Sequence, residues 1–121
     1  IDGRPDNFLV ISGDDPITVP IIHLGGDGVI SVVANALPKS FSEMVTSAMV
    51  GDVEGPQKAQ NSFEDITNLM FNEGNPAGVK AALDVLNLCG AEVRLPLVRM
   101  SEDGYNQMRV ELENLGEIAN A

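Results

Sequence analysis

An α/β fold is the class that the sequence predicts, with two parallel strands at the start of the chain and helices after them. Residues 8–11 and 29–33 are short apolar runs rich in β-forming side chains, and their apolarity is continuous rather than alternating. Continuous apolarity favours strands that are buried on both faces. A short segment with helical spacing separates the two runs, so we expect a strand, helix, strand unit with a right-handed crossover.

The predicted crossover helix has clear start and stop signals. Asp15 is expected to cap its N-terminus, and Pro16 suits its first turn. The glycine-rich residues 25–28 end the helix, because glycine readily adopts the left-handed backbone of caps and tight turns. His23 is interpreted as a partly exposed residue at the helix end, since nothing nearby completes a metal site.

Helical spacing of apolar residues continues from Pro38 to the end of the chain, where four helices are predicted. Their limits, in chain order, are Ser40 or Ser42 to Gly51, residues 53–71, Asn75-Pro76 onward, and Ser101 onward. Tyr105 is expected on the buried face of the last helix.

Composition and charge argue against several classes of function. The chain has 121 residues, 44% of them hydrophobic, which suits one small domain or a part of a larger one. A formal net charge of -11 argues against nucleic acid and anionic membranes as partners, because both bind positive surfaces. No apolar run approaches the roughly 20 residues of a membrane span, and no signal peptide opens the sequence. We therefore expect a cytoplasmic protein.

The single cysteine, Cys89, is expected to be a small buried thiol at a helix end. It cannot form an internal disulfide, and the only histidine, His23, is too far away in sequence to suggest a catalytic pair. Lys80 lies on a predicted helix and is interpreted as a surface or hinge cation.

Two parallel strands are too few for a stable sheet, because their edges and both apolar faces need partners. The neighbours must come from a preceding sequence or from another copy of the chain. A (β/α)8 barrel of about 250 residues is the natural source. The predicted fold is therefore the last two βα units of such a barrel in residues 1–40, followed by a C-terminal helical domain in residues 41–121.

Four segments of the chain resemble the dihydrodipicolinate synthase family. Residues 8–15 and 24–35 look like the seventh and eighth strand regions of that family, and residues 75–83 and 94–97 are similar to its C-terminal helical segment. The match is collinear over nearly the whole chain and covers roughly the final two-fifths of a family member. Sister lyases that act on N-acetylneuraminate or keto-deoxy sugar acids share the architecture.

The resemblance implies a reaction without a cofactor. In this family a lysine at the end of the sixth strand forms a Schiff base with pyruvate, and the resulting enamine attacks an aldehyde, which is aspartate semialdehyde in the synthase of lysine and diaminopimelate biosynthesis. Such a lysine must be desolvated to be neutral near pH 7. Lys58 and Lys80 lie on predicted helices, and Lys39 lies in a predicted loop beyond the second strand. No catalytic residue is therefore expected in this chain, which should be inactive alone.

Gly13 and Ile30 are the substrate-binding residues that the resemblance implies. Gly13 is placed near the aldehyde substrate, with a simple turn glycine as the alternative. Ile30 matches the position whose backbone carbonyl faces pyruvate, although the residue pattern alone favours a core side chain. Asp14 and Asp15 are interpreted as helix-capping residues rather than an acid–base pair or metal ligands. The glycines of residues 25–28 enter a strand, which is the wrong order for a phosphate-binding loop.

Three hypotheses of function remain open. The first is the C-terminal part of the synthase, whose family members are commonly tetramers, and the second is a sister aldolase. The third is a non-catalytic, acidic helical interaction module whose strands pair across a dimer. Exposed strand edges predict self-association of the chain in each case.

Overall fold

The computed structural model describes residues 1–118, which form parts of two compact units divided between Glu64 and Asp65. The first unit contains a parallel sheet and the helices that follow it, and the second is helical. The domain boundary predicted at residues 40 and 41 concerns the architecture of a larger barrel protein, and it stays a prediction.

The sheet pairs β1 (Ile11–Ser12) with β2 (Gly28–Val29) in parallel, with Ile11 opposite Gly28 and Ser12 opposite Val29. The parallel strand–helix–strand pattern is thus confirmed, but each strand is shorter than predicted. Phe8, Leu9 and Ile11 are exposed, so burial on both faces is not seen in this chain. The reason is that, within residues 1–118, each strand has one neighbour and no second sheet layer.

The crossover consists of a 3-10 turn, η1 (Asp15–Ile17), and the helix α1 (Thr18–His23). The N-cap of η1 is Asp14, whose side chain makes no capping bond, so the prediction that Asp15 caps this segment is wrong. Asp15 is already inside the first turn, and its carboxylate is engaged elsewhere. Gly25 follows the helix with a φ of 95°, as its predicted role requires.

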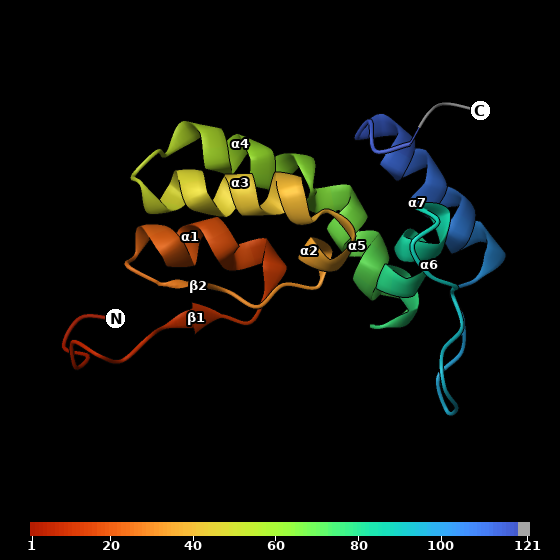
Figure 1. Cartoon of the computed structure of the whole chain (residues 1–121), viewed down its shortest axis with the longest axis horizontal. Helices are drawn as coiled ribbons and strands as arrows, with labels where there is room; N and C mark the ends of the chain where they lie inside the picture. The colour runs from red at the N-terminus through yellow and green to blue at the C-terminus, as the bar shows by residue number, and fades with distance from the viewer. Residues whose placement is uncertain (119–121) are drawn as a thin grey trace. The chain divides into compact units, whose positions relative to one another are not determined.

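The helices α2 (Val33–Ala36), α3 (Pro38–Met49) and α4 (Glu54–Ser62) complete the first unit. Figure 1 shows α3 and α4 side by side, with α1 on the other side of α3. The ring centroids of Phe41 and Phe63 lie 6.0 Å apart in the interior of the first unit. Val33, predicted in the second strand, lies at the start of α2, and Lys39, predicted in a loop, lies at the start of α3.

The helix predicted over residues 53–71 is two helices, α4 and α5 (Glu64–Asn72), separated at Phe63. The Phe63 amide bonds to the carbonyl of Gln60, three residues back, which tightens the end of α4. Packing of the buried Phe63 ring overrides an apolar spacing that otherwise continues through the break.

In the second unit, α6 (Ala77–Val85) packs against α7 (Glu102–Asn114). Ser101 is confirmed as the cap of α7, because its Oγ accepts a hydrogen bond from the Gly104 amide at 3.1 Å. The Glu73 carboxylate accepts hydrogen bonds from the Ser101 hydroxyl and amide, and these bonds hold the pKa of Glu73 below its usual range.

Cys89 lies in the segment that leaves α6, and its side chain is exposed rather than buried as predicted. The chain turns away from the helix at Asn87, which has a φ of 58°, so the thiol no longer follows the buried face of α6. The Nζ atom of the half-buried Lys80 lies 3.6 Å from the Cys89 sulfur.

Gly78, the glycine of α6, should not tolerate a side chain. A Cβ at this position would lie 2.5 Å from the Cα of Met70, which is backbone and cannot rotate away. We expect Gly78→Ala to lower the free energy of unfolding by about 1–3 kcal/mol, as measured by urea titration with circular dichroism. Gly13→Ala is the matched control, because nothing lies within 4 Å of a Cβ there. Equal stability of the two variants would contradict the prediction.

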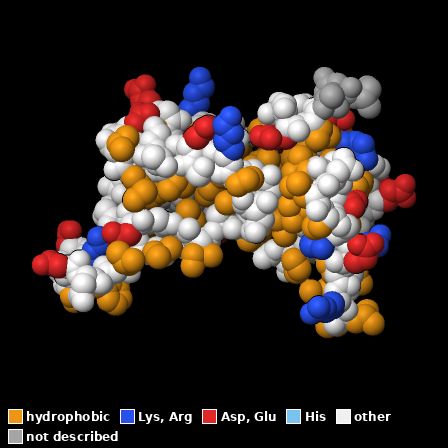
Figure 2. Space-filling view, viewed as in Figure 1, with side chains coloured by type: hydrophobic (Ala, Val, Ile, Leu, Met, Phe, Trp, Pro, Cys, Tyr) orange, Lys and Arg blue, Asp and Glu red, His pale blue; other side chains and the backbone are white. Residues whose placement is uncertain are grey.

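The exposed apolar side chains along β1 should cause self-association. Figure 2 shows apolar side chains gathered over the part of the surface that holds this strand and the residues before it. We expect the average mass in light scattering to rise with concentration, and Phe8→Lys with Leu9→Lys to reduce the rise. Met49→Lys, which changes an exposed apolar residue of α3, is the control. A monodisperse monomer at all concentrations would contradict the prediction.

Candidate functional site

The two strands end at the same edge of the sheet, and the residues that follow them define the candidate site. Gly13 follows β1 and Ile30 follows β2, directly after the paired residues Ser12 and Val29. The Ile30 amide donates a hydrogen bond to the Ser12 carbonyl at 2.9 Å. The structure therefore brings the two predicted site residues to one edge, where α/β enzymes place their ligands. Their contact with substrate stays a prediction.

Gly13 lies in an open, exposed loop that its neighbours hold in place. The Ser12 hydroxyl donates to the Asp14 carbonyl at 2.9 Å and accepts from the Asp14 amide at 3.2 Å, so Gly13 is enclosed by a small ring of bonds. Ser12 itself is buried. The loop is thus fixed at its base while the backbone at Gly13 stays accessible.

The Ile30 side chain is 76% exposed, so the core position favoured by the residue pattern alone is wrong for this chain. Only Val29 of this apolar run pairs in the sheet, together with Gly28 before it. An apolar run predicts burial only where a neighbouring element is present to cover it.

Asp15 connects the loops after β1 and β2, which sequence analysis did not predict. Its side chain is only 4% exposed and accepts hydrogen bonds from the Ser31 hydroxyl and, at 3.0 Å, from the Val32 amide. The Ser31 oxygen in turn accepts from the Ala34 amide at 2.8 Å. Asp15 and Ser31 therefore bind backbone amides at the start of α2, whose N-cap is Val32, and the serine two residues before Val33 was the available signal.

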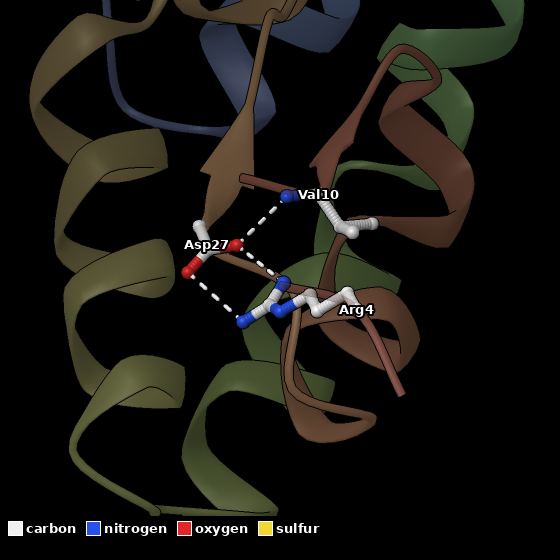
Figure 3. A network of polar contacts seen from close by, with 3 residues as sticks. All are labelled: Arg4, Val10 and Asp27. Carbon is white, nitrogen blue, oxygen red and sulfur yellow. Dashed lines mark hydrogen bonds and ion pairs between the residues drawn. The ribbon is translucent and has the colours of Figure 1, made fainter. Parts of the chain in front are cut away.

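A second carboxylate, Asp27, fastens the opposite edge of the sheet (Figure 3). It accepts a hydrogen bond from the Val10 amide at 2.8 Å and forms an ion pair with Arg4 at 2.6 Å. The Val10 bond and the Arg4 guanidinium lower the pKa of Asp27. The glycine-rich segment around Asp27 thus has a structural role, in agreement with its interpretation as a turn.

None of the three lysines belongs to the strands or to the loops that follow them at the candidate site edge. Lys39 and Lys58 are exposed on α3 and α4, and Lys80 lies on α6. Tyr105 lies on α7, where its hydroxyl donates to Asp84 at 2.6 Å and that carboxylate raises the pKa of the phenol. Residues 1–118 contain no cluster of three or more acidic, histidine or cysteine side chains that could hold a metal ion. None of the helices in this range is long and apolar enough to cross a membrane.

A parallel strand–helix–strand unit with accessible loops at the carboxyl edge is the arrangement that α/β enzymes use. Residues 2–115 match the dihydrodipicolinate synthetase family. The chain belongs to this family.

Known relatives agree with this assignment. The 4-hydroxy-tetrahydrodipicolinate synthase of Phocaeicola vulgatus is 46% identical over 115 residues, which are 95% of this chain and 39% of that protein. A crystal structure of dihydrodipicolinate synthase from Thermotoga maritima superposes with a TM-score of 0.89 at 37% identity, over 93% of this chain and 38% of that one. The chloride-inhibited synthase of Acinetobacter baumannii, complexed with pyruvate, gives a TM-score of 0.87 at 36% identity, over 92% of this chain and 38% of that one. The chain thus spans about two-fifths of these relatives' length.

The Asp27 contacts should make the N-terminal segment sensitive to acid. The folded pKa of Asp27 is lowered, so the stabilisation is present above the pKa of an unfolded aspartate, about 3.9, and is lost as the pH falls through the folded pKa. We expect the Val10 amide resonance to shift and its hydrogen exchange to accelerate in that range. Asp27→Asn should abolish this pH dependence, whereas Asp14→Asn should leave it intact. An unchanged pH profile in Asp27→Asn would contradict the prediction.

Proposed function

We propose that this chain forms one wall of the active site of 4-hydroxy-tetrahydrodipicolinate synthase, a Schiff-base lyase that condenses pyruvate with aspartate semialdehyde in lysine and diaminopimelate biosynthesis. The observation that carries the proposal is the position of Gly13 and Ile30 at one strand edge in a chain of this family. We expect the intact enzyme to be cytoplasmic, to need no cofactor and to be a homo-oligomer, as tetramers are expected in the family.

We further propose that β1 and β2 are the last two strands of a (β/α)8 barrel, with residues 41–121 as its helical C-terminal domain. The exposed apolar residues Phe8, Leu9 and Ile11 support this assignment, because they are side chains that neighbouring strands and helices would cover. The two-fifths share of the relatives' length leaves room for six more βα units.

The proposed chemistry gives this chain a binding role rather than a proton-transfer role. Gly13 carries no side chain, so an aldehyde substrate can approach its backbone closely. The Ile30 carbonyl is a hydrogen-bond acceptor facing pyruvate. The Schiff-base lysine is expected outside residues 1–121, since Lys39 and Lys58 are exposed and solvated and Lys80 lies on α6 rather than at a strand end.

Borohydride trapping tests this proposal. The chain alone, treated with pyruvate and sodium borohydride, should form no adduct, because no lysine is held at the strand edge. The chain joined to the preceding portion of the Phocaeicola vulgatus synthase should form one adduct, on a lysine outside residues 1–121, and should consume aspartate semialdehyde. Intact-mass and peptide mass spectrometry provide the measurement.

An adduct on Lys39, Lys58 or Lys80 would contradict the proposal. The same joined protein should not cleave N-acetylneuraminate or keto-deoxy sugar acids. Cleavage of these compounds, without use of aspartate semialdehyde, would assign the chain to a sister aldolase instead.

A further inference from the structure

We infer that Asp15 is a positioning residue that orients the Ile30 carbonyl toward pyruvate, an inference that rests on the function proposed above. Asp15 does not reach the substrate itself in this scheme. Its buried carboxylate holds the two residues that follow Ile30, and thereby the plane of the peptide group to which that carbonyl belongs.

The peptide group after Ile30 is held from both sides. On one side, the Ile30 amide bonds to the Ser12 carbonyl at 2.9 Å, as a continuation of the sheet. On the other side, the Ser31 hydroxyl and the Val32 amide both donate to the Asp15 carboxylate. Because a peptide group is planar, the direction of this carbonyl depends on the ψ of Ile30 and the φ of Ser31, and the bonds on both sides restrict these two angles.

Packing of Ile30 itself cannot supply this constraint. Its side chain is 76% exposed, whereas Val33 downstream is fully buried. Residues 30–32 therefore connect the sheet to a buried helix start, and hydrogen bonds are the contacts that hold them. Each oxygen of the Asp15 carboxylate accepts one of these hydrogen bonds. Oδ1 accepts from the Ser31 hydroxyl and Oδ2 from the Val32 amide.

The chemistry of this position requires two acceptors. An asparagine has nearly the same shape but only one acceptor oxygen, so its NH2 group would face either the Ser31 hydroxyl or the Val32 amide. The Ser31 oxygen already accepts from the Ala34 amide, which limits how the hydroxyl can reorient. Asp15→Asn should therefore break at least one of the two bonds at almost constant volume.

A purely structural capping role makes a different prediction from a positioning role. Loss of a helix cap lowers stability and the folded fraction, but it leaves the KM of the folded molecules unchanged. Loss of carbonyl orientation weakens pyruvate binding in molecules that are fully folded. The KM for pyruvate, measured on samples shown to be folded, separates the two roles.

The first measurement uses the chain alone. Hydrogen exchange followed by NMR should show a protected Val32 amide, which exchanges about tenfold faster in Asp15→Asn, as expected for loss of a hydrogen bond to a charged group. Asp14→Asn is the matched control, because Asp14 is the exposed neighbour and its carboxylate makes neither bond. Equal protection of Val32 in the wild type and in Asp15→Asn would overturn the inference.

The second measurement uses the joined, full-length protein of the trapping experiment. Asp15→Asn should raise the KM for pyruvate about three- to tenfold, whereas Asp14→Asn should not. Should Asp15→Asn fail to fold, Ser31→Ala should raise the KM while Ser31→Thr, which keeps the hydroxyl, should restore it. Unchanged KM values in the folded Asp15→Asn or Ser31→Ala variants would overturn the inference and leave the proposed function intact. Absence of pyruvate trapping in the wild-type joined protein would instead overturn the proposed function, and this inference with it.

Discussion

The buried carboxylate of Asp15 is the interaction on which the geometry of the strand edge depends. It lies after β1 yet bonds to residues that follow β2, so it joins two loops that are sixteen and more residues apart in sequence. A buried carboxylate is stable only where its oxygens are satisfied, and here both oxygens accept hydrogen bonds. The same bonds begin α2, whose Val33 enters the interior of the first unit. The start of the helical part and the shape of the candidate site therefore share one set of contacts.

Local signals in the sequence predicted those features that depend on a few adjacent residues. Ser101 caps α7 as expected, and Gly25 has the left-handed backbone that ends α1. The order of strand, helix and strand followed from two apolar runs with turn residues between them. Gly13 and Ile30 reach the same edge because parallel strands end together, so their proximity also follows from the sequence once the strands are paired.

Features that depend on distant partners could not be predicted in this way. The break at Phe63 depends on a ring contact with Phe41, and no residue near position 63 signals it. Asp15 looked like an ordinary helix cap, because its partners Ser31 and Val32 become neighbours only after the crossover has folded. Arg4 and Asp27 are similarly brought together by the pairing of β1 with β2. The exposure of Ile30 reflects which neighbouring elements are present, a property that no apolar pattern contains.

The two carboxylates also determine how the strands can be aligned. Asp27 holds the backbone before β1, and Asp15 holds the backbone after β2, so the short pair is anchored at both ends. A slip of one residue would break both sets of bonds and would turn the side chains of the slipped strand to the other face. The register of the two strands is thus set by contacts outside the two paired positions of each strand. Substitutions at the exposed positions of α1 would therefore leave Gly13 and Ile30 opposite each other, because the contacts that set the register lie outside that helix.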